Sequence, residues 1–277
     1  MQKNKAFQRL KIFLLALYLL AAILPLYWIV LTSLKGSKDI YTLPLQYWVK
    51  HPTLESYQKL FSFTDFGRYF LNSITLSLGA ALMAMIISFL GGYALSRYRK
   101  LHIKKFILLA MYFTQTIPSF IIMVPLFRIF SKLGLIDNRL ALGIVYTSTV
   151  VAFSTIMCKS FLDRIPVSLE EAAKIDGCTL IQALGKVIFP MAVPGMAAIF
   201  CFSFVNIWNE LFLAVMLLMS NKKMTVPVAL NSFISKAGIS WDVMSAGIVV
   251  ALLPTMIVFA FGQKYIVAGL TAGSVKE

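Results

Sequence analysis

The stretch Ile12–Leu34, IFLLALYLLAAILPLYWIVLTSL, contains no charged residue. A helix needs about 20 mostly apolar residues to cross the hydrocarbon core of a bilayer, so this stretch is long enough to do so. Five further apolar runs follow along the chain: Phe70–Leu95, Phe106–Ile129, Leu140–Phe161, Met191–Met219 and Met244–Phe261. None of them shows the alternating pattern of a barrel strand. The sequence therefore predicts an all-α polytopic membrane bundle of six transmembrane helices.

The composition of the whole chain also indicates a membrane protein. Of the 277 residues, 59% are hydrophobic and only 13% are charged, whereas a soluble domain has about 25% charged residues. A water-soluble protein of this size could not bury so much apolar side chain. The net charge of +15 would otherwise be typical of a nucleic-acid-binding protein. Because the basic residues fall between the apolar runs, we expect membrane lipid as a partner and no nucleic acid.

The distribution of basic residues predicts the orientation of the bundle. The first run follows a basic segment, but it is too long for a signal peptide and lacks a cleavage site, so we expect a retained helix. With a cytoplasmic N-terminus, more than half of the 26 Lys and Arg residues lie on the cytoplasmic side, most densely between Arg97 and Lys105. We therefore predict a multi-pass protein of the cytoplasmic membrane with both termini in the cytoplasm. The segment between the fourth and fifth runs is then cytosolic.

This cytosolic segment, residues 163–190, is predicted to form two short helices. Ser168 and Glu171 have the spacing of a capping box, and Gly177 is a natural stop, so the first helix is expected over about Leu169–Asp176. Thr179 and Gln182 repeat the capping box. Two further expectations concern the ends and the surface of these helices: Pro190 ends or kinks the second helix, and Glu170 pairs with Lys174.

An isolated two-turn helix is not stable by itself, so the first of these helices must pack against another surface. Its small side chains, Ala172 and Ala173, would let a partner approach closely, which favours a docking role. Two alternatives remain open from the residues alone. Glu171 could serve only as a helix cap, or the segment could lie on lipid headgroups as an amphipathic helix.

Polar groups inside the apolar runs are candidates for a transport pathway. Glu210 is the only acidic residue that we place within a run, and it follows Trp208 and Asn209. Together they offer an aromatic face and hydrogen-bonding groups to a polar solute, although a hydrogen bond between helices would explain the same residues. Prolines within the runs predict kinks that are either passive or line a moving pathway: Pro25, Pro118, Pro125, Pro194 and Pro254.

The sequence predicts neither a catalytic site nor a metal site in this chain. The three cysteines and two histidines lack metal-ligand or redox spacing. Gly185-Lys186 matches part of a phosphate-binding loop, but the glycine five residues earlier and the following Ser or Thr are missing. We therefore expect that the chain binds no cofactor and no nucleotide of its own.

The cytosolic segment resembles the EAA loop of the permeases of ABC importers. That pattern is E-A-A, three residues, G, nine residues, then I-x-L-P. Here it is matched by Glu171-Ala172-Ala173, Gly177 and Val187-Ile188-Phe189-Pro190, with Val and Phe as conservative replacements. Tyr69–Ser73, Trp208–Glu210 and Gln263–Thr271 resemble the carbohydrate-uptake branch, within which the chain is similar to the shorter, six-helix subunit of maltose and multiple-sugar permeases.

This resemblance implies a single transmembrane domain over residues 1–277, with residues 163–190 as a cytoplasmic coupling loop. It implies as partners a second, homologous permease, two ATP-binding subunits that hold ATP and Mg, and an extracytoplasmic sugar-binding protein. The chain itself would be non-catalytic. The residues that the resemblance assigns to coupling with the ATPase are Glu171, Ala172, Ala173, Asp176 and Gly177.

The predicted function is ATP-driven import of a sugar, a disaccharide or oligosaccharide. One alternative is a secondary transporter for a small polar solute that works without an ATPase, which predicts paired intramembrane acids and an internal repeat. Another is an intramembrane enzyme, which would need a catalytic cluster. Either outer segment, Lys35–Tyr69 or Asn221–Trp241, could meet the binding protein or anchor at the headgroups.

Overall fold

The computed structural model describes the backbone of residues 2–98, 103–235 and 238–271 and the side chains of residues 7–98, 103–234 and 238–265. The basic residues Arg99, Lys100 and Lys276, which contribute to the predicted orientation, lie outside the described residues. The chain divides into two compact units, Met1–Gly67 with Ala229–Leu253 and Arg68–Val228 with Pro254–Glu277. Each unit is described by itself.

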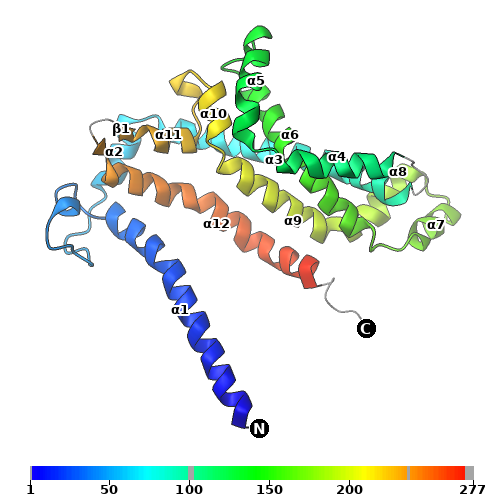
Figure 1. Ribbon diagram of the computed structural model, residues 1–277, viewed down its shortest axis with the longest axis horizontal. Helices are drawn as coiled ribbons and strands as arrows, with labels where there is room; N and C mark the ends of the chain where they lie inside the picture. Colours follow the sequence, from blue (N-terminus) through cyan, green and yellow to red (C-terminus); the bar gives the residue numbers. More distant parts are fainter. Residues whose placement is uncertain (1, 99–102, 236–237, 272–277) are drawn as a thin grey trace. The chain divides into compact units, whose positions relative to one another are not determined.

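The first unit begins with the long helix α1, Gln2–Ser33 (Figure 1). Only 6% of its apolar span is buried, so its surface is free for lipid or another chain. At its end, the rings of Trp28 and Tyr27 contact those of Tyr47 and Trp48, with centroids 5.9 and 6.2 Å apart. Aromatic residues of this kind are typical of the interface between lipid and water.

Shorter elements complete the first unit. They are the 3-10 helix η1 (Asp39–Tyr41), α2 (Glu55–Phe63), most of α11 (Val226–Ser232), the antiparallel strands β1 (Ile234–Ser235) and β2 (Gly238–Ile239), and the first part of α12 (Trp241–Thr271). Asp242 of α12 accepts a hydrogen bond of 2.7 Å from Ser37 and lies 3.6 Å from the ammonium of Lys59. Leu60 and Phe66 are fully buried. These contacts tie α2 and the segment after α1 to the start of α12.

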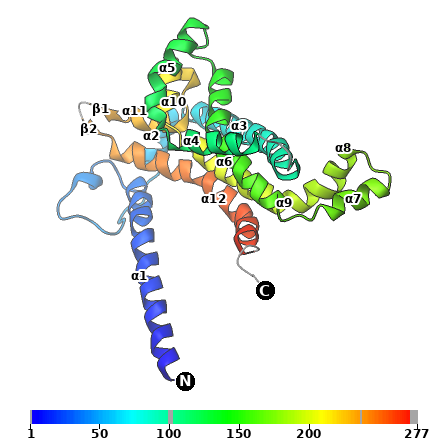
Figure 2. The same cartoon turned by 45° about the vertical axis from the view of Figure 1, so that its right-hand side comes forward.

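The second unit contains the remaining helices. They are α3 (Phe66–Arg97), α4 (Lys104–Thr116), α5 (Ser119–Lys132), α6 (Arg139–Leu162), α7 (Ser168–Ile175), α8 (Leu180–Ala183), the π-helix η2 (Leu184–Ile188), α9 (Phe189–Trp208), α10 (Phe212–Leu217), the 3-10 helix η3 (Asn221–Lys223) and the end of α12. In both views α7 and α8 lie at one end of α6 and α9, and α10 lies at the other (Figures 1 and 2).

Small residues let the helices of the second unit approach closely. A Cβ atom added at Gly92 of α3 would lie 2.9 Å from the Cβ of Cys158 on α6, and one added at Gly195 of α9 would lie 2.5 Å from Phe161. Around these contacts Leu162 and Ile199 are fully buried. Close packing through small residues is the usual way in which membrane helices associate.

The all-α fold class is confirmed, with only the β1–β2 hairpin as strand among the described residues. Five described helices are long and apolar enough to cross a membrane, or six if α4 and α5 are one broken span. Those two helices meet at 98°, so the run Phe106–Ile129 is not one straight helix. Pro118 has no N–H to continue α4, and Ile117 before it is extended. Pro25, Pro125, Pro194 and Pro254 lie inside helices.

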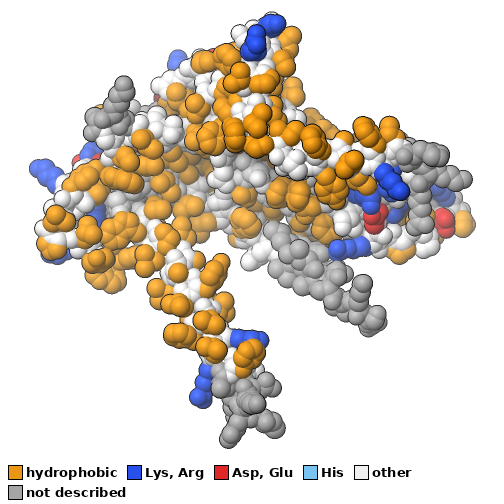
Figure 3. Space-filling model, in the orientation of Figure 1, with side chains coloured by type: hydrophobic (Ala, Val, Ile, Leu, Met, Phe, Trp, Pro, Cys, Tyr) orange, Lys and Arg blue, Asp and Glu red, His pale blue; other side chains and the backbone are white. Residues whose placement is uncertain are grey.

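The fifth predicted run, Met191–Met219, is also divided, because α9 ends at Trp208 and α10 begins at Phe212. Hydrophobic side chains cover much of the face seen in Figure 3, including most of the described part of α1. An exposed apolar surface of this extent is expected where helices meet lipid.

Candidate functional site

Helix α7 begins one residue earlier than predicted and without the predicted cap. Val167 is the N-cap residue, and no side chain caps the helix there. Ser168 is already the first helical residue, so its hydroxyl is past the position from which a cap acts. The prediction of a capping box between Ser168 and Glu171 is therefore wrong.

The predicted stop at Gly177 is confirmed. Gly177 has φ of 81°, a conformation that a side chain disfavours. Its N–H donates to the carbonyl of Lys174 at 3.1 Å, and the N–H of Cys178 donates to that of Ala173 at 2.9 Å. These two bonds form a Schellman motif, which satisfies carbonyls at the end of α7 and turns the chain sharply toward α8.

The second predicted capping box, at Thr179 and Gln182, is confirmed at the start of α8. The Thr179 hydroxyl accepts from the Gln182 N–H at 3.4 Å, and the Thr179 N–H donates to the Gln182 amide oxygen at 2.9 Å. Pro190 does not end this helix, because α8 runs through the five-residue π-turn η2 into α9, of whose first turn Pro190 is part. Since proline cannot donate a hydrogen bond, a π-turn just before it accommodates the missing donor.

A buried ion pair attaches α7 to α3. Glu170 is 5% exposed and pairs with the guanidinium of Arg97, and the hydroxyl of Tyr93 donates to its other oxygen at 2.8 Å. The Nη1 and Nη2 groups of Arg97 donate to the carbonyls of Leu162 and Ile165, both at 3.0 Å, and Nη1 also donates to the hydroxyl of Ser96 at 3.2 Å. One arginine therefore holds the end of α6, the loop after it and α7 together.

Glu170 thus turns toward α3, and the predicted pair between Glu170 and Lys174 is wrong. The physical reason is that the planar guanidinium fork of Arg97 offers a buried carboxylate stronger and better-oriented hydrogen bonds than an exposed lysine does. Sequence reasoning missed Arg97 and Tyr93 as parts of this site. The sequence feature that could have indicated a buried ion pair is the presence of two adjacent acids, Glu170 and Glu171, on a helix that must bury one face.

A second tether lies beside the first. Asp163 follows α6 and accepts hydrogen bonds from Ser96 of α3 at 2.6 Å and from Lys159 at 2.5 Å. Burial raises the pKa of the Asp163 carboxyl, but the bonds from Lys159 and Ser96 outweigh it and hold that pKa below its ordinary value. The carboxylate therefore stays charged at neutral pH and binds the loop to α3.

The predicted coupling residues are divided between the two faces of α7. Ala173 is buried against the bundle, whereas Glu171, Ala172, Asp176 and Gly177 are exposed. The inward face thus holds the helix in place, and the outward face is available to a partner.

The outward surface also contains two large apolar side chains that sequence reasoning missed. Ile175 at the end of α7 is 85% exposed, and Ile181 of α8 is 81% exposed. An apolar side chain flanked by charged ones, presented by a helix at the end of a bundle, is well suited to dock into a cleft of another protein. The position of Ile175 two residues before the helix stop at Gly177 could have indicated an exposed apolar anchor.

Trp208, Asn209 and Glu210 lie at the break between α9 and α10. The Trp208 ring is 2% exposed and stacks on Phe204 at 5.8 Å between centroids. Asn209 is exposed, and its amide donates to the carbonyl of Val205 in its own helix. Glu210 accepts hydrogen bonds from the N–H groups of Leu213 and Ala214 at the start of α10. In this structure Glu210 therefore fixes the first turn of α10.

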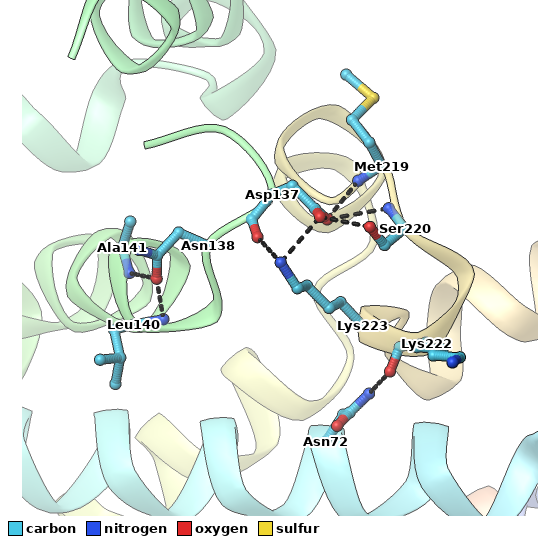
Figure 4. A network of polar contacts seen from close by, with 9 residues as sticks. All are labelled: Asn72, Asp137, Asn138, Leu140, Ala141, Met219, Ser220, Lys222 and Lys223. Carbon is cyan, nitrogen blue, oxygen red and sulfur yellow. Dashed lines mark hydrogen bonds and ion pairs between the residues drawn. The ribbon is translucent and has the colours of Figure 1, made fainter. Parts of the chain in front are cut away.

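The end of the bundle opposite α7 is held by Asp137 (Figure 4). Its carboxylate accepts from the N–H groups of Met219 and Ser220 at 3.0 and 2.9 Å and from the ammonium of Lys223 at 2.9 Å. Burial raises the pKa of Asp137, but the bonds from Ser220, Lys223 and Met219 together lower it far below its ordinary value. The charged form thus ties the segment after α10 to the loop before α6.

The same segment is also bound to α3 and α6. The amide of Asn72 donates to the carbonyl of Lys222 at 3.0 Å (Figure 4). It also donates to the carbonyl of Met224 at 2.9 Å, and its oxygen accepts from Arg139. Asn138 caps α6 through the N–H groups of Leu140 and Ala141. Sequence reasoning did not find this network, because its members come from separate parts of the chain.

A bundle of membrane helices that presents a short helix with an exposed face at one end is the arrangement expected of a membrane subunit of a transport system. The chain belongs to the family of inner membrane components of binding-protein-dependent transport systems, whose model matches residues 84–272. The predicted resemblance to ABC-importer permeases is thereby confirmed. The chain is a multi-pass permease component of this inner-membrane family.

Relatives match almost the whole chain. The inner membrane ABC transporter permease protein YcjP of Escherichia coli is 34% identical over 95% of this chain and 94% of its own. The sulfoquinovosyl glycerol permease SmoH of Agrobacterium fabrum is 34% identical over 94% and 91%. A chain from the crystal structure of a bacterial ABC transporter for the acidic polysaccharide alginate superposes with a TM-score of 0.82, at 25% identity and covering 96% and 98% of the two chains.

Proposed function

We propose that this chain is a permease subunit of an ATP-driven importer for a disaccharide or oligosaccharide. Besides the family, the relatives support a sugar as the substrate: one is a permease for sulfoquinovosyl glycerol, one for diacetylchitobiose and one for arabinooligosaccharides. The observation that carries the proposal is α7, whose exposed face is presented at the end of the bundle while Glu170 anchors it to α3.

In this proposal, residues 163–190 form the coupling loop of a single transmembrane domain over residues 1–277. Glu171, Ala172 and Asp176 contact a cleft of the ATPase, and Ile175 adds an apolar anchor. Ala173 seats the helix on the bundle, and Gly177 ends it.

Force on α7 reaches the bundle through hydrogen-bonded contacts. Arg97 joins α7 to α3 and to the end of α6, while α8 and η2 lead without interruption into α9. Closure of the ATPase would therefore move three spans together. This would change the balance between the inward-facing and outward-facing states of the permease.

The orientation follows from the same proposal. The end with α7 lies in the cytoplasm together with both termini, so the end with α10 and Asp137 faces outward, toward a sugar-binding protein. The larger share of Lys and Arg residues in the segments assigned to the cytoplasm supports this orientation. The proposed location is the cytoplasmic membrane.

The proposed complex contains a second, homologous permease and two ATPase subunits that bind ATP and Mg and perform the hydrolysis. The exposed apolar length of α1 supports a further membrane partner, since a helix packed in its own subunit would bury more of its surface. The contribution of Trp208, Asn209 and Glu210 to the sugar pathway stays a prediction. Glu210 would act there by fixing α10.

The test is co-purification of the ATPase with the chain expressed alongside its neighbouring genes. We expect Glu171→Arg and Ile175→Asp to release the ATPase and to abolish uptake that persists when the proton gradient is collapsed. Glu55→Arg is the matched control for ATPase co-purification, because Glu55 is a partly exposed acid on α2 whose pair with Lys59 contributes little. Normal ATPase binding by both α7 variants, or uptake by the chain alone, would refute the proposal.

A further inference from the structure

A cavity of about 350 Å³, open at the surface of this chain, lies where α4 and α5 meet, against α6 and α10. Pockets that bind small molecules usually measure about 300–1,000 Å³. Five polar side chains line this one: Thr114, Gln115, Ser119, Ser148 and Thr149. The other lining residues are apolar, and none of the lining residues is charged.

The depth of the cavity is unusual for so many polar groups. Ser148 and Thr149 lie near the middle of α6, a helix of 24 residues and therefore about 36 Å long. The hydrocarbon core of a bilayer is about 30 Å thick, so these side chains lie near its centre. Polar groups at that depth usually face a water-filled cavity or a partner.

The hydrogen-bonding capacity of the cavity is only partly used. Ser148 and Thr149 donate to the carbonyls of Val145 and Tyr146 of their own helix, which leaves their oxygens able to accept. The amide of Gln115 and the hydroxyl of Ser119 make no hydrogen bond to another described residue. The cavity thus offers both donors and acceptors to a ligand with several hydroxyl groups.

The break between α4 and α5 and the contact of Glu210 with α10 shape the walls of the cavity. The 98° break at Pro118 exposes Gln115 and Ser119 at the ends of two helices instead of within one continuous span. Leu213 lines the opposite wall and is placed by the hydrogen bond from its N–H to Glu210. Broken helices near the bilayer centre are where transporters commonly form their binding sites.

We propose that this cavity is the part of the sugar pathway contributed by this chain, and that it takes an uncharged sugar ring. The proposal rests on the proposed import function. The lining residues include no cationic group that could pair with the carboxylate or sulfonate of an acidic sugar, which favours an uncharged one. Hydroxyl groups, by contrast, match the amide and hydroxyl side chains present.

Accessibility to water tests whether the cavity lies on the pathway. In a Cys178→Ser background, labelling of Ser148→Cys is compared with labelling of Val124→Cys. Val124 is the control because it is 68% exposed and lies on α5 between two cavity-lining residues, Ile122 and Leu126, but does not itself line the cavity. The probe is the cationic thiol reagent MTSET, applied to membrane vesicles opened by freezing and thawing. We expect labelling at position 148 to be at least tenfold faster. Equal rates, or no labelling at 148, would show a cavity filled by lipid or by a neighbouring helix and would overturn the proposal.

Protection from labelling tests the class of sugar. A pool of cellobiose and maltose should slow labelling at position 148, while digalacturonate should not. In Gln115→Leu the half-protecting concentration should rise about five- to tenfold, as expected for one lost hydrogen bond, and it should stay unchanged in the control Thr116→Val. No protection by the neutral pool, or equal protection by digalacturonate, would overturn the assignment. ATPase co-purification reports the import function separately, so the two failures are distinguishable.

Discussion

Breaking the ion pair between Arg97 and Glu170 should detach α7 from the bundle. Their side chains are 9% and 7% exposed. Removal of one partner from a buried pair costs about 3–5 kcal/mol, because the other charge is left without compensation. The apolar attachment of α7 is smaller: it consists mainly of the partly buried Leu169 and the small Ala173, and complete burial of a leucine contributes only about 1.5–3 kcal/mol. In Glu170→Ala the docked state of α7 should therefore no longer dominate.

Two measurements test this change. Hydrogen exchange at the backbone amides of residues 168–177 should accelerate by at least tenfold in Glu170→Ala, because each factor of ten in the opening equilibrium corresponds to about 1.4 kcal/mol. In the assembled complex, ATP hydrolysis should continue while uptake falls, since the ATPase would move a helix that no longer moves α3.

A double variant separates loss of the charge pair from loss of packing. Arg97→Met combined with Glu170→Leu removes both charges and keeps apolar volume, an exchange that is often neutral or stabilising for a buried pair. We expect it to restore slow exchange, whereas Arg97→Met alone should behave like Glu170→Ala. If Glu170→Ala kept wild-type exchange and coupled transport, the ion pair would not be what holds α7.

Three further predictions concern other contacts. Gly177→Ala should destabilise the end of α7 by about 1–2 kcal/mol because of its φ of 81°, measured as faster exchange at Cys178. Asp137→Ala should lower the melting temperature at neutral pH. Because the pKa of Asp137 is lowered in the folded protein, the contribution of its carboxylate to stability is complete above about pH 4 and is lost as the pH falls toward the lowered pKa. The variant should therefore lose less stability on acidification than the wild-type protein. Gly92→Ala should reduce the free energy of unfolding by about 1–3 kcal/mol through overpacking, because its Cβ would lie 2.9 Å from atoms of α6. Gly79→Ala, whose Cβ would have nothing within 4 Å, should be neutral or stabilising. Equal melting temperatures for these two variants would contradict the packing argument.

Local signals in the sequence predicted the parts of the site that depend on neighbouring residues. Gly177 was found because only a residue tolerant of positive φ can end α7 so sharply, and Thr179 because its partner Gln182 is three residues away. The apolar runs predicted the spans for the same reason, since the length of a membrane helix is set by the thickness of the bilayer.

Contacts between distant residues were not predictable in this way. Arg97 and Glu170 are 73 residues apart, and nothing in either neighbourhood indicates the other. The spacing of Glu170 and Lys174 instead suggested an exposed ion pair, but in the structure Glu170 pairs with the buried Arg97. Pro118 did indicate a kink, but a proline alone does not determine whether a span bends slightly or breaks into two helices, because the neighbouring helices decide this.

The π-turn Leu184–Ile188 has a consequence for how this chain tolerates changes in length. A π-turn accommodates one more residue than an α-helical turn, so it stores a single-residue insertion without rotating the helix on its C-terminal side. Deletion of one residue there, such as Lys186, should convert the π-turn into an α-helical turn, without the one bond that Pro190 cannot donate, and leave α9 in the same register toward α3 and α6. A deletion within α9 would instead turn every later side chain by about 100° and bring its lipid-facing residues into the protein interior.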